Sequence, residues 1–268
     1  MTVNQESLHQ LMREVGQDVL LPRFGQVAGS LKADGSIVTE ADLVAQERLT
    51  DTLLQLYPDT VVLGEEMSVD EQQRCFASDQ PLWCVDPLDG TSNFAAGIPY
   101  FAISVALIEK GRVILGAVYD PVRDELFHAD LASGAILNSV PLPALNGQDL
   151  LGPLDLSQSI ALVDFKRLDP SLASRIAATP PYKSQRSFGS VALDWCWLAA
   201  NRVHVYLHGR ANLWDYAAGH FIFQQAGGRS CTLQGEPIFE ATLNGRSSVA
   251  ATNVKLFEEW NRYLSVLH

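Results

Sequence analysis

The sequence predicts an α+β fold built in layers, and two features of its hydrophobic pattern carry this prediction. Before residue 58, apolar residues recur at three- and four-residue steps, which is typical of amphipathic helices. From residue 61 to 130 the chain changes to β-branched and aromatic runs broken by turn signals, and after residue 160 strands and helices alternate. Strands grouped in one stretch and followed by mixed elements indicate stacked layers rather than a plain doubly wound sheet.

Two helices are expected at the start of the chain, over residues 3–27 and 39–57, with a turn-rich segment between them. Thr39 fits the N-cap of the second helix, and Asp42, three residues further on, completes the pattern of a capping box. Pro58 then ends this helix.

Short strands are expected next. The run VVL leads into Gly64-Glu65-Glu66, and the run LWCV is expected to end as a strand at Asp86. Residues 101–130 contain Lys-Gly and Asp-Pro turn signals and predict antiparallel strands. The second half is expected to contain, in order, a strand near residue 162, a helix from Pro170, a strand near 184, a helix over 189–200, a strand over 204–208, a helix over 214–226, two short strands and a last helix from Val254.

The bulk composition bounds the class of protein. With 268 residues, 47% of them apolar, the chain is expected to form one domain, with an N-terminal α+β lobe over about residues 1–150 and a C-terminal α/β lobe over about 151–268. Nineteen Lys and Arg against 31 Asp and Glu give a net charge of −12. This charge argues against nucleic acids and anionic membranes as partners.

Other features favour a cytoplasmic location. Four scattered cysteines without a CxxC pair are expected to be free thiols in a reducing compartment. The polar N-terminus does not read as a signal peptide, and no apolar run is long enough to predict a transmembrane helix.

The segment WCVDPLDGTSNF, residues 83–94, places Asp86 and Asp89 around Pro87. The proline biases Asp86 toward an extended conformation, and the turn that follows lets both carboxylates and the Leu88 carbonyl converge on one point. An all-oxygen set of this kind suits Mg²⁺. Asp, Pro and Gly are also the ordinary residues of a surface turn, so the segment alone leaves both interpretations open.

Three further acids lie where such a site would need them, and each also has an ordinary explanation. Glu65 follows a strand and a glycine, as residues of solvated loops do. Asp215 stands at the start of an expected helix and Asp42 in a capping box, so capping alone explains both. The order Asp42, Glu65, Asp86 with Asp89, and Asp215 indicates a common site more strongly than any one of them does. Bound cations would also explain how so acidic a chain holds a phosphate.

This pattern resembles the inositol monophosphatase family of Mg²⁺-dependent, lithium-sensitive phosphatases. WCVDPLDGTSNF looks like the family's first signature and LWDYAAGHFIFQQAGG like its second. SIVTEAD, GEE, GAVYDPVRDELFHA and RSFGSVALDWCWLAA also fall in the expected order, so the resemblance covers nearly the whole chain. It implies a layered αβαβα sandwich, a homodimer, and two or three Mg²⁺ ions as cofactors.

The resemblance also assigns metal ligands. Glu65, Asp86 and the Leu88 carbonyl would hold a first ion. Asp86, Asp89 and Asp215 would hold a second, and a third, weaker ion would bind to Glu65.

The same resemblance assigns catalytic and phosphate-binding residues. The amides of Gly90 and Thr91 would bind phosphate, and the Thr91 hydroxyl, paired with Asp42, would position the attacking water together with Glu65. Lys32 lies in the segment that matches the family's mobile metal-binding loop. The implied reaction is an in-line displacement by a metal-activated water, without a covalent intermediate.

Contacts to the rest of the substrate are expected from Asp89, Ser190, His208 and Asp215. In members that act on inositol phosphate, a glutamate stands seven residues before the Trp-Asp aspartate, where this chain has His208. A histidine presents different hydrogen-bond donors, and Arg210 nearby would suit a second anionic group.

The sequence therefore predicts a Mg²⁺-dependent phosphomonoesterase acting on a small phosphorylated substrate, first of all inositol monophosphate. Histidinol phosphate, fructose 1,6-bisphosphate and 3′-phosphoadenosine 5′-phosphate stay open as alternatives. Two other classes also stay open: a catalytically weak regulatory member that binds a protein partner, and a metal-sensing domain without turnover.

Overall fold

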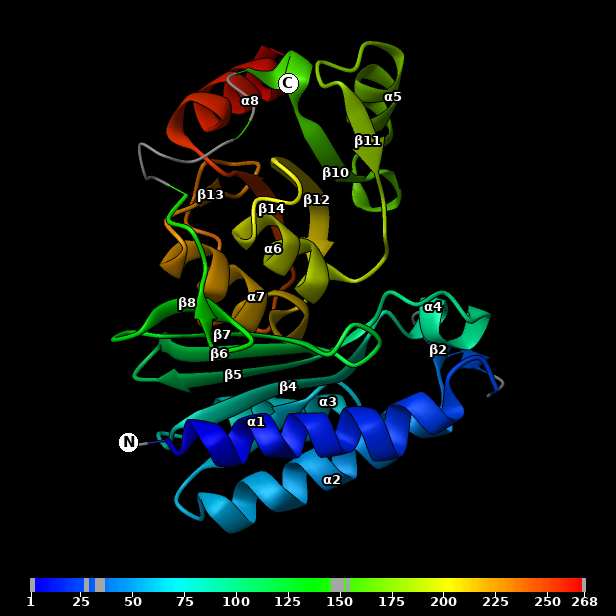
Figure 1. Ribbon diagram of the computed structural model, residues 1–268, viewed down its shortest axis with the longest axis vertical. Coiled ribbons are helices and arrows are strands. Elements are labelled where there is room, and N and C mark those ends of the chain that lie inside the picture. Colours follow the sequence, from blue (N-terminus) through cyan, green and yellow to red (C-terminus); the bar gives the residue numbers. More distant parts are fainter. Residues whose placement is uncertain (1–2, 27–28, 32–36, 146–151, 153–154, 267–268) are drawn as a thin grey trace.

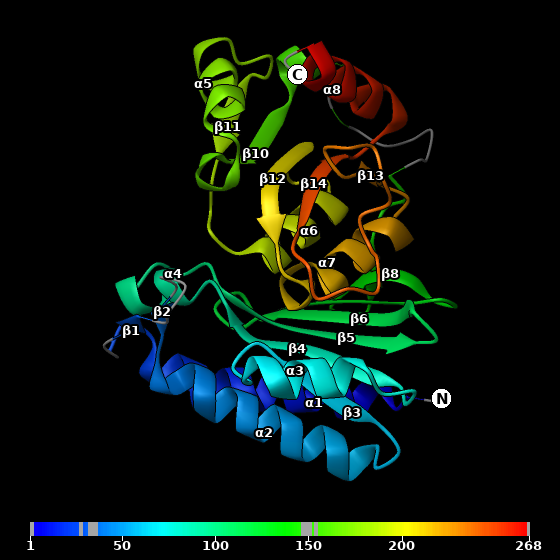
Figure 2. The same ribbon diagram turned by 180° about the vertical axis from the view of Figure 1, so that it is seen from behind.

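The computed structural model describes residues 3–26, 29–31, 37–145, 152 and 155–266. The elements stack in the order helix, sheet, helix, sheet, helix, as Figures 1 and 2 show from opposite sides. The α+β class and the αβαβα layering expected from the sequence are confirmed. The division into lobes near residue 150 stays a prediction, and residues 146–151 lie outside the described ranges.

The first layer contains the two helices predicted at the start of the chain. Helix α1 (Gln5–Glu14) continues as a π-helix (Val15–Leu20) and a 3₁₀ turn (Leu21–Arg23), and α2 spans Glu40–Leu56. Strands β1 (Ser30–Leu31) and β2 (Ile37–Val38) pair antiparallel between the helices, within the expected turn-rich segment. Lys32 lies outside the described residues.

The second layer is a seven-stranded sheet with the strand order β3-β4-β5-β6-β7-β8-β9. Its strands are β3 (Val61–Gly64), β4 (Leu82–Asp89), β5 (Ala102–Glu109), β6 (Arg112–Asp120), β7 (Glu125–Asp130), β8 (Gly134–Leu137) and β9 (Val140–Pro141). Strands β3 and β4 are parallel, and the remaining neighbours are antiparallel. The short helices α3 (Val69–Phe76) and α4 (Thr91–Ala96), which follow β3 and β4, are absent from the sequence-based expectation.

Strand β4 is longer than the sequence predicts. The expected end at Asp86 is wrong, because the strand continues through Pro87 to Asp89. Its pairing with β5 shifts register between Asp86 and Asp89, so the missing N–H of Pro87 falls at an irregularity of the ladder. This irregularity lies where the candidate metal ligands are.

The three remaining layers, formed by residues after 155, follow the predicted alternation of strands and helices. Helices α6 (Val191–Ala199) and α7 (Leu213–Gln225) form the middle layer, and α5 (Pro170–Ala178) and α8 (Val254–Val266) the outer one. Between them lies a five-stranded sheet of β11 (Ser184–Arg186), β10 (Ile160–Asp164), β12 (Val205–Ala211), β14 (Arg246–Ala251) and β13 (Arg229–Cys231), in that order. Strand β10 pairs parallel with both β11 and β12, so these three strands end at the same edge. The 3₁₀ turns Leu156–Gln158 and Phe165–Arg167 flank β10.

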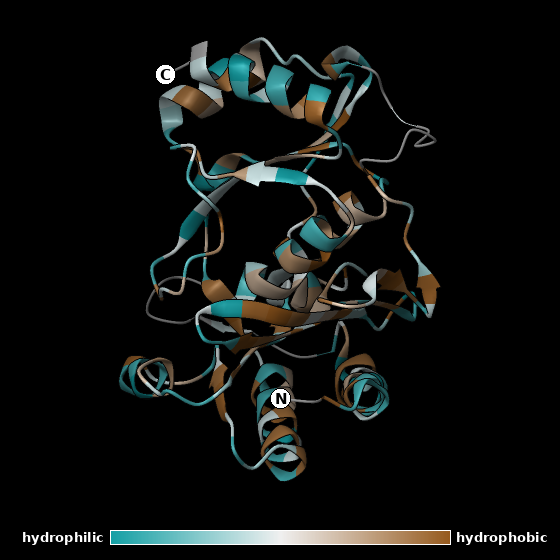
Figure 3. Cartoon of the chain, turned by 90° about the vertical axis from the view of Figure 1, so that its left-hand side faces the viewer, coloured by the Kyte–Doolittle hydropathy of each residue, from teal (hydrophilic) through white to brown (hydrophobic). Residues whose placement is uncertain are grey.

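Three apolar cores separate the layers. One lies between the N-terminal helices and the first sheet, one between that sheet and α6 with α7, and one between the second sheet and α5 with α8. Strand β4 is buried at all eight positions because both faces of its sheet are covered. Figure 3 shows the strands of the first sheet as predominantly hydrophobic, whereas the helices at the outside mix hydrophobic and hydrophilic residues.

Two smaller expectations are also resolved. The four cysteines are free thiols, as predicted. Among the described residues, none of the helices combines the length and the apolar character that a membrane crossing would need.

Candidate metal centre

Three acids from separate elements meet where β3 and β4 end and α7 begins. Glu65, Asp86 and Asp215 each offer a carboxylate oxygen, and these oxygens lie within 4.8 Å of one another. Asp86 is buried, and the other two side chains are half-buried. The structure thus brings together three of the acids that the sequence proposed as metal ligands.

Local contacts place each of these acids. Asp86 Oδ1 accepts the Leu88 N–H at 3.0 Å across the irregular end of β4. Asp215 is the third residue of α7, and its Oδ2 accepts the Asn212 N–H at 2.7 Å, as the acid of a capping box does.

The loop that carries Glu65 is held by its neighbours. The Glu65 amide donates to the Val85 carbonyl at 3.2 Å, and the Gln72 side chain on α3 donates to the Gly64 and Glu65 carbonyls. A Cβ at Gly64 would come within 2.1 Å of the Gln46 side chain. A larger residue at position 64 would therefore displace the end of the Gln46 side chain.

The surroundings of Asp86 and Asp215 disfavour their ionised forms. Burial, together with the charges of Glu65, Asp89 and Asp215, raises the pKa of Asp86 well above its ordinary value. Burial and the neighbouring carboxylates also raise the pKa of Asp215 well above its ordinary value. Carboxylates that are buried this close together repel unless protons or cations lie among them. An all-oxygen set with this charge fits Mg²⁺ or a similar hard divalent ion.

Asp89 lies near this cluster, and its carboxylate accepts hydrogen bonds from the start of α6. Its Oδ2 accepts the Ser190 hydroxyl and the Ala192 amide, both at 2.6 Å, at the start of α6. Burial raises the pKa of Asp89, and these hydrogen bonds oppose that shift. The charge of Asp89 still acts on Asp86 and Asp215. The role of Asp89 as a ligand of a second ion stays a prediction, and so does the role of the Leu88 carbonyl as a ligand of the first.

Asp42 and Thr91 come together as the sequence predicts, although 49 positions separate them. The Thr91 hydroxyl lies 2.9 Å from Asp42 Oδ1 and 3.0 Å from the Leu88 carbonyl oxygen. Asp42 also completes the capping box of α2 with Thr39, so the capping explanation is confirmed, and the catalytic role of Asp42 stays a prediction. Burial raises the pKa of Asp42, and the hydrogen bonds from Thr39 and Thr91 partly offset that rise.

Gly90 allows the turn before α4. Its φ of 98° is left-handed, and a Cβ there would lie 3.1 Å from the Tyr100 carbonyl oxygen. Helix α4 begins at the next residue, Thr91.

His208 is paired with an acid that sequence reasoning missed. Its Nε2 lies 3.1 Å from Asp164 Oδ2, at the neighbouring ends of the parallel strands β12 and β10. Hydrogen bonding and attraction to His208 lower the pKa of Asp164 against the opposing effect of burial. No sequence motif marks Asp164, because its partner is 44 positions away.

Two arginines lie near these acids. The charge of Arg167 contributes to the lowered pKa of Asp164, and at Asp215 it opposes in small part the rise in pKa caused by burial and the neighbouring carboxylates. The Arg210 side chain packs over Gly245, where a Cβ would lie 2.7 Å from Arg210 Cγ, and its role toward a second anionic group stays a prediction.

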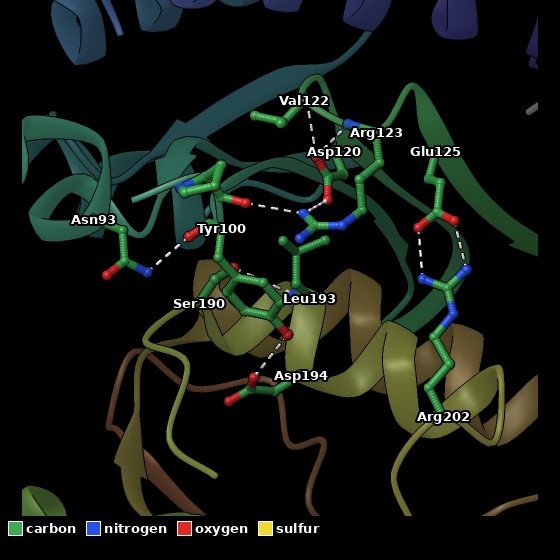
Figure 4. A network of polar contacts seen from close by, with 11 residues as sticks. Asn93, Tyr100, Asp120, Val122, Arg123, Glu125, Ser190, Leu193, Asp194 and Arg202 are labelled. Carbon is green, nitrogen blue, oxygen red and sulfur yellow. Dashed lines mark hydrogen bonds and ion pairs between the residues drawn. The ribbon is translucent and has the colours of Figure 1, made fainter. Parts of the chain in front are cut away.

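A further polar network, also missed, fastens α6 to the segment after α4. Figure 4 shows Tyr100 pointing to Asp194 on α6, and the two are joined by a hydrogen bond of 3.0 Å. Asn93 donates to the carbonyls of Tyr100 at 2.8 Å and Phe188 at 2.7 Å. An acid inside the apolar run VALDWCWLAA was a signal for Asp194. Burial raises its pKa well above the ordinary value.

Comparison with known proteins agrees with this geometry. The model of the inositol monophosphatase family matches residues 4–266. The chain is 35% identical over 207 residues to the Nus factor SuhB of Pasteurella multocida, which covers 77% of this chain and 75% of that protein. It is 31% identical over 254 residues to the inositol-1-monophosphatase of Bacillus subtilis, with 93% of each chain covered. A crystal structure of Staphylococcus aureus SaIMPase-II with bound inositol monophosphate has a TM-score of 0.79 and 28% identity, covering 98% of this chain and 93% of that one.

Proposed function

Because the chain belongs to the inositol monophosphatase family, we propose that it is a Mg²⁺-dependent phosphomonoesterase whose substrate is inositol monophosphate. The observation that carries the proposal is the group of three carboxylate oxygens from Glu65, Asp86 and Asp215. Three carboxylates this close together repel one another when ionised, and a divalent cation bound among them would remove that repulsion.

Glu65, Asp86 and the Leu88 carbonyl would hold the first ion, Asp86, Asp89 and Asp215 would hold the second, and a third, weaker ion would bind to Glu65. When bound, Mg²⁺ would offset the negative charge of the carboxylates and the phosphate and would polarise phosphate and water.

The chain's own residues act on the water and the phosphate. The Thr91 hydroxyl has one proton and two acceptors within reach, Asp42 Oδ1 and the Leu88 carbonyl. When the Thr91 hydroxyl donates its proton to Asp42 Oδ1, the Thr91 oxygen is left to accept a hydrogen bond from the attacking water. Asp42 and Glu65 then orient the water and help to remove its proton. The amides of Gly90 and Thr91 bind the phosphate.

The substrate's remaining groups are expected to meet Asp89, Ser190, His208 and Asp215. The Ser190 hydroxyl donates to Asp89 and accepts the Leu193 N–H at 3.3 Å, so it would offer the substrate one remaining lone pair rather than its proton. The charge of Arg167, close enough to act on Asp164 and Asp215, would attract a second anionic group on the substrate. Fructose 1,6-bisphosphate and 3′-phosphoadenosine 5′-phosphate are substrates of that kind, and histidinol phosphate is a further alternative.

Phosphate release tests the proposal. The purified chain is incubated with Mg²⁺ and, in turn, inositol 1-phosphate, histidinol phosphate, fructose 1,6-bisphosphate and 3′-phosphoadenosine 5′-phosphate. We expect the highest kcat/KM with inositol 1-phosphate and no release in EDTA. Absence of release from all four would reject the phosphatase assignment. Preference for a bisphosphate, weakened by Arg167→Gln, would reassign the substrate but keep the reaction.

A second candidate function follows from the relatives named Nus factor SuhB. A regulatory role through a protein partner would not need the metal centre. The chain and its Asp215→Asn variant are therefore compared as replacements for SuhB in Escherichia coli, whose SuhB is 35% identical over 212 residues. Equal replacement by both would support a role independent of catalysis. The homodimer and the cytoplasmic location stay predictions.

A further inference from the structure

The two carboxylate oxygens of Asp42 have different partners. Oδ2 accepts the Thr39 backbone N–H at 2.8 Å and the Thr39 hydroxyl at 2.6 Å. Oδ1 accepts the hydroxyl of Thr91 at 2.9 Å. Asp42 is 1% exposed and Thr39 3% exposed, so water does not compete for these contacts. Oδ2 thus takes part in the capping box of α2, and Oδ1 contacts Thr91 in the candidate site.

The direction of the Thr39 hydroxyl proton follows from its neighbours. The hydroxyl oxygen accepts the Ala41 N–H at 3.2 Å, which leaves its proton for Asp42. With two donors on the same oxygen, the carboxylate resists rotation about its Cβ–Cγ bond. A rotated carboxylate would lose both donors and would no longer present Oδ1 to Thr91.

We propose that Thr39 is a positioning residue of the site: its hydroxyl holds the Asp42 carboxylate in the orientation that aligns Thr91. The inference rests on the proposed function, because Asp42 and Thr91 act on the attacking water there. Thr39 itself touches neither the substrate nor the candidate metal ligands, and its effect passes through Asp42 to Thr91.

The chain contains a matched control at the start of α3. The Ser68 N–H and hydroxyl both donate to Glu71 Oε2, at 2.9 and 2.5 Å, and the Glu71 N–H donates back to Ser68 Oγ. The bonding pattern matches that of Thr39 and Asp42, but both residues are exposed. A change in this box reports what the loss of a cap does to stability without touching Asp42.

The experiment compares Thr39→Gly, Thr39→Ser and Ser68→Gly in the full chain with Mg²⁺ and the best substrate of the panel. Glycine is tolerated at an N-cap but lacks the hydroxyl. Because a hydrogen bond to a charged group is lost, we expect kcat of Thr39→Gly to fall by about ten- to a hundredfold, with KM unchanged. Thr39→Ser should restore kcat. Ser68→Gly should leave kcat unchanged and lower Tm by less than Thr39→Gly does, because its capping box is exposed.

Two further measurements separate positioning from a structural effect. In the Asp42→Asn background, Thr39→Gly should have no additional effect on kcat, because the path through Asp42 is already broken. Binding of Mn²⁺, followed by electron paramagnetic resonance, should be the same in Thr39→Gly as in the wild type. An equal fractional loss of kcat in both backgrounds, or a parallel loss of Mn²⁺ binding, would overturn the inference.

The proposed function and the inference fail in different ways. A wild-type chain that releases no phosphate from any substrate of the panel rejects the proposed function and the inference with it. A wild-type chain that is active, with Thr39→Gly equally active, rejects the inference alone.

Discussion

The first turns of helices α2 and α3 have the same local structure but lie in very different surroundings. In both, the amide and the hydroxyl of the N-cap residue donate to one oxygen of an acid three positions later. At α2 the acid is Asp42, which is buried and whose second oxygen meets Thr91. At α3 the acid is Glu71, which is exposed.

The pKa values of the two acids move in opposite directions. Burial raises the pKa of Asp42 despite its three hydrogen bonds. Glu71 is exposed, so burial has almost no effect there, and the corresponding hydrogen bonds from Ser68 lower its pKa. A capping box therefore sets the orientation of an acid, and burial decides its chemistry. Asp215 shows the same rule a second time, because it is both the capping-box acid of α7 and a member of the metal cluster.

The largest expected effect is at the capping-box acid of α7. Asp215→Asn keeps an oxygen that can accept the Asn212 N–H, so the helix start is retained while a metal-binding charge is lost. We expect phosphatase activity to fall by roughly 10³-fold or more, since a metal ion contributes several kcal/mol and each tenfold is about 1.4 kcal/mol. Asp89→Asn is expected to have a comparable effect. Circular dichroism checks that the fold is intact, and wild-type turnover in either variant would refute the metal assignment.

The next effect contrasts the boxes of α2 and α3 directly. Asp42→Asn should lower kcat by about 10²-fold, which is the lower end of the range for loss of a general base. Glu71→Gln should leave kcat unchanged. The Mg²⁺ concentration that gives half-maximal activity should stay the same in both, because neither acid belongs to the metal cluster. Steady-state kinetics check this prediction, and equal kcat values for the two variants would remove Asp42 from the mechanism.

Burial of the metal-site acids also predicts a pH effect on stability. The pKa values of Asp86, Asp89 and Asp215 are raised in the folded state, so above about pH 4 the metal-free folded state binds more protons than the unfolded state does. The stability that this provides is lost as pH rises through the raised pKa values. Burial lowers the pKa of His9 to about 4 and of His220 to about 3, and their contribution is lost as pH falls below about 6.5.

Below about pH 6.5, the acids and the histidines therefore change the stability in opposite directions as pH rises. Above that pH, only the acids change it. In EDTA, Tm should fall as pH rises above about 6.5, and Asp86→Asn should make that fall smaller. Excess Mg²⁺ should reverse the trend, because cations bind the ionised carboxylates. A Tm that is independent of pH in EDTA would contradict the raised pKa values.

The smallest effect is expected from a change in the exposed capping box of α3, and it is an effect on stability. Ser68→Ala removes an N-cap, which costs about 1 kcal/mol and shifts Tm by about 2–4 °C in a chain of this size. Activity should not change. A loss of activity would show instead that α3 acts on Glu65 through Gln72, which donates to the Glu65 carbonyl. Thermal melts and a single kinetic assay distinguish these outcomes.

Much of the fold follows from local pattern. The N-cap and capping box of α2, the antiparallel run after β4 and the alternation after residue 160 were predicted because hydrophobic periodicity and capping act within a few residues. Helices α3 and α4 were missed because eight and six residues are too few for a periodic signal. The pattern Ser68-x-x-Glu71 did mark the start of α3.

The sequence by itself determined which acids are candidates, because they occur in a fixed order beside turns and helix starts, and its resemblance to a known family implied the reaction. Only the tertiary structure decided which of two equivalent capping boxes is buried, that Asp89 faces α6, and that His208 pairs with Asp164. The physical reason is distance along the chain. Capping bonds span three residues, whereas the bond between Thr91 and Asp42 spans 49 and forms only after the layers have packed.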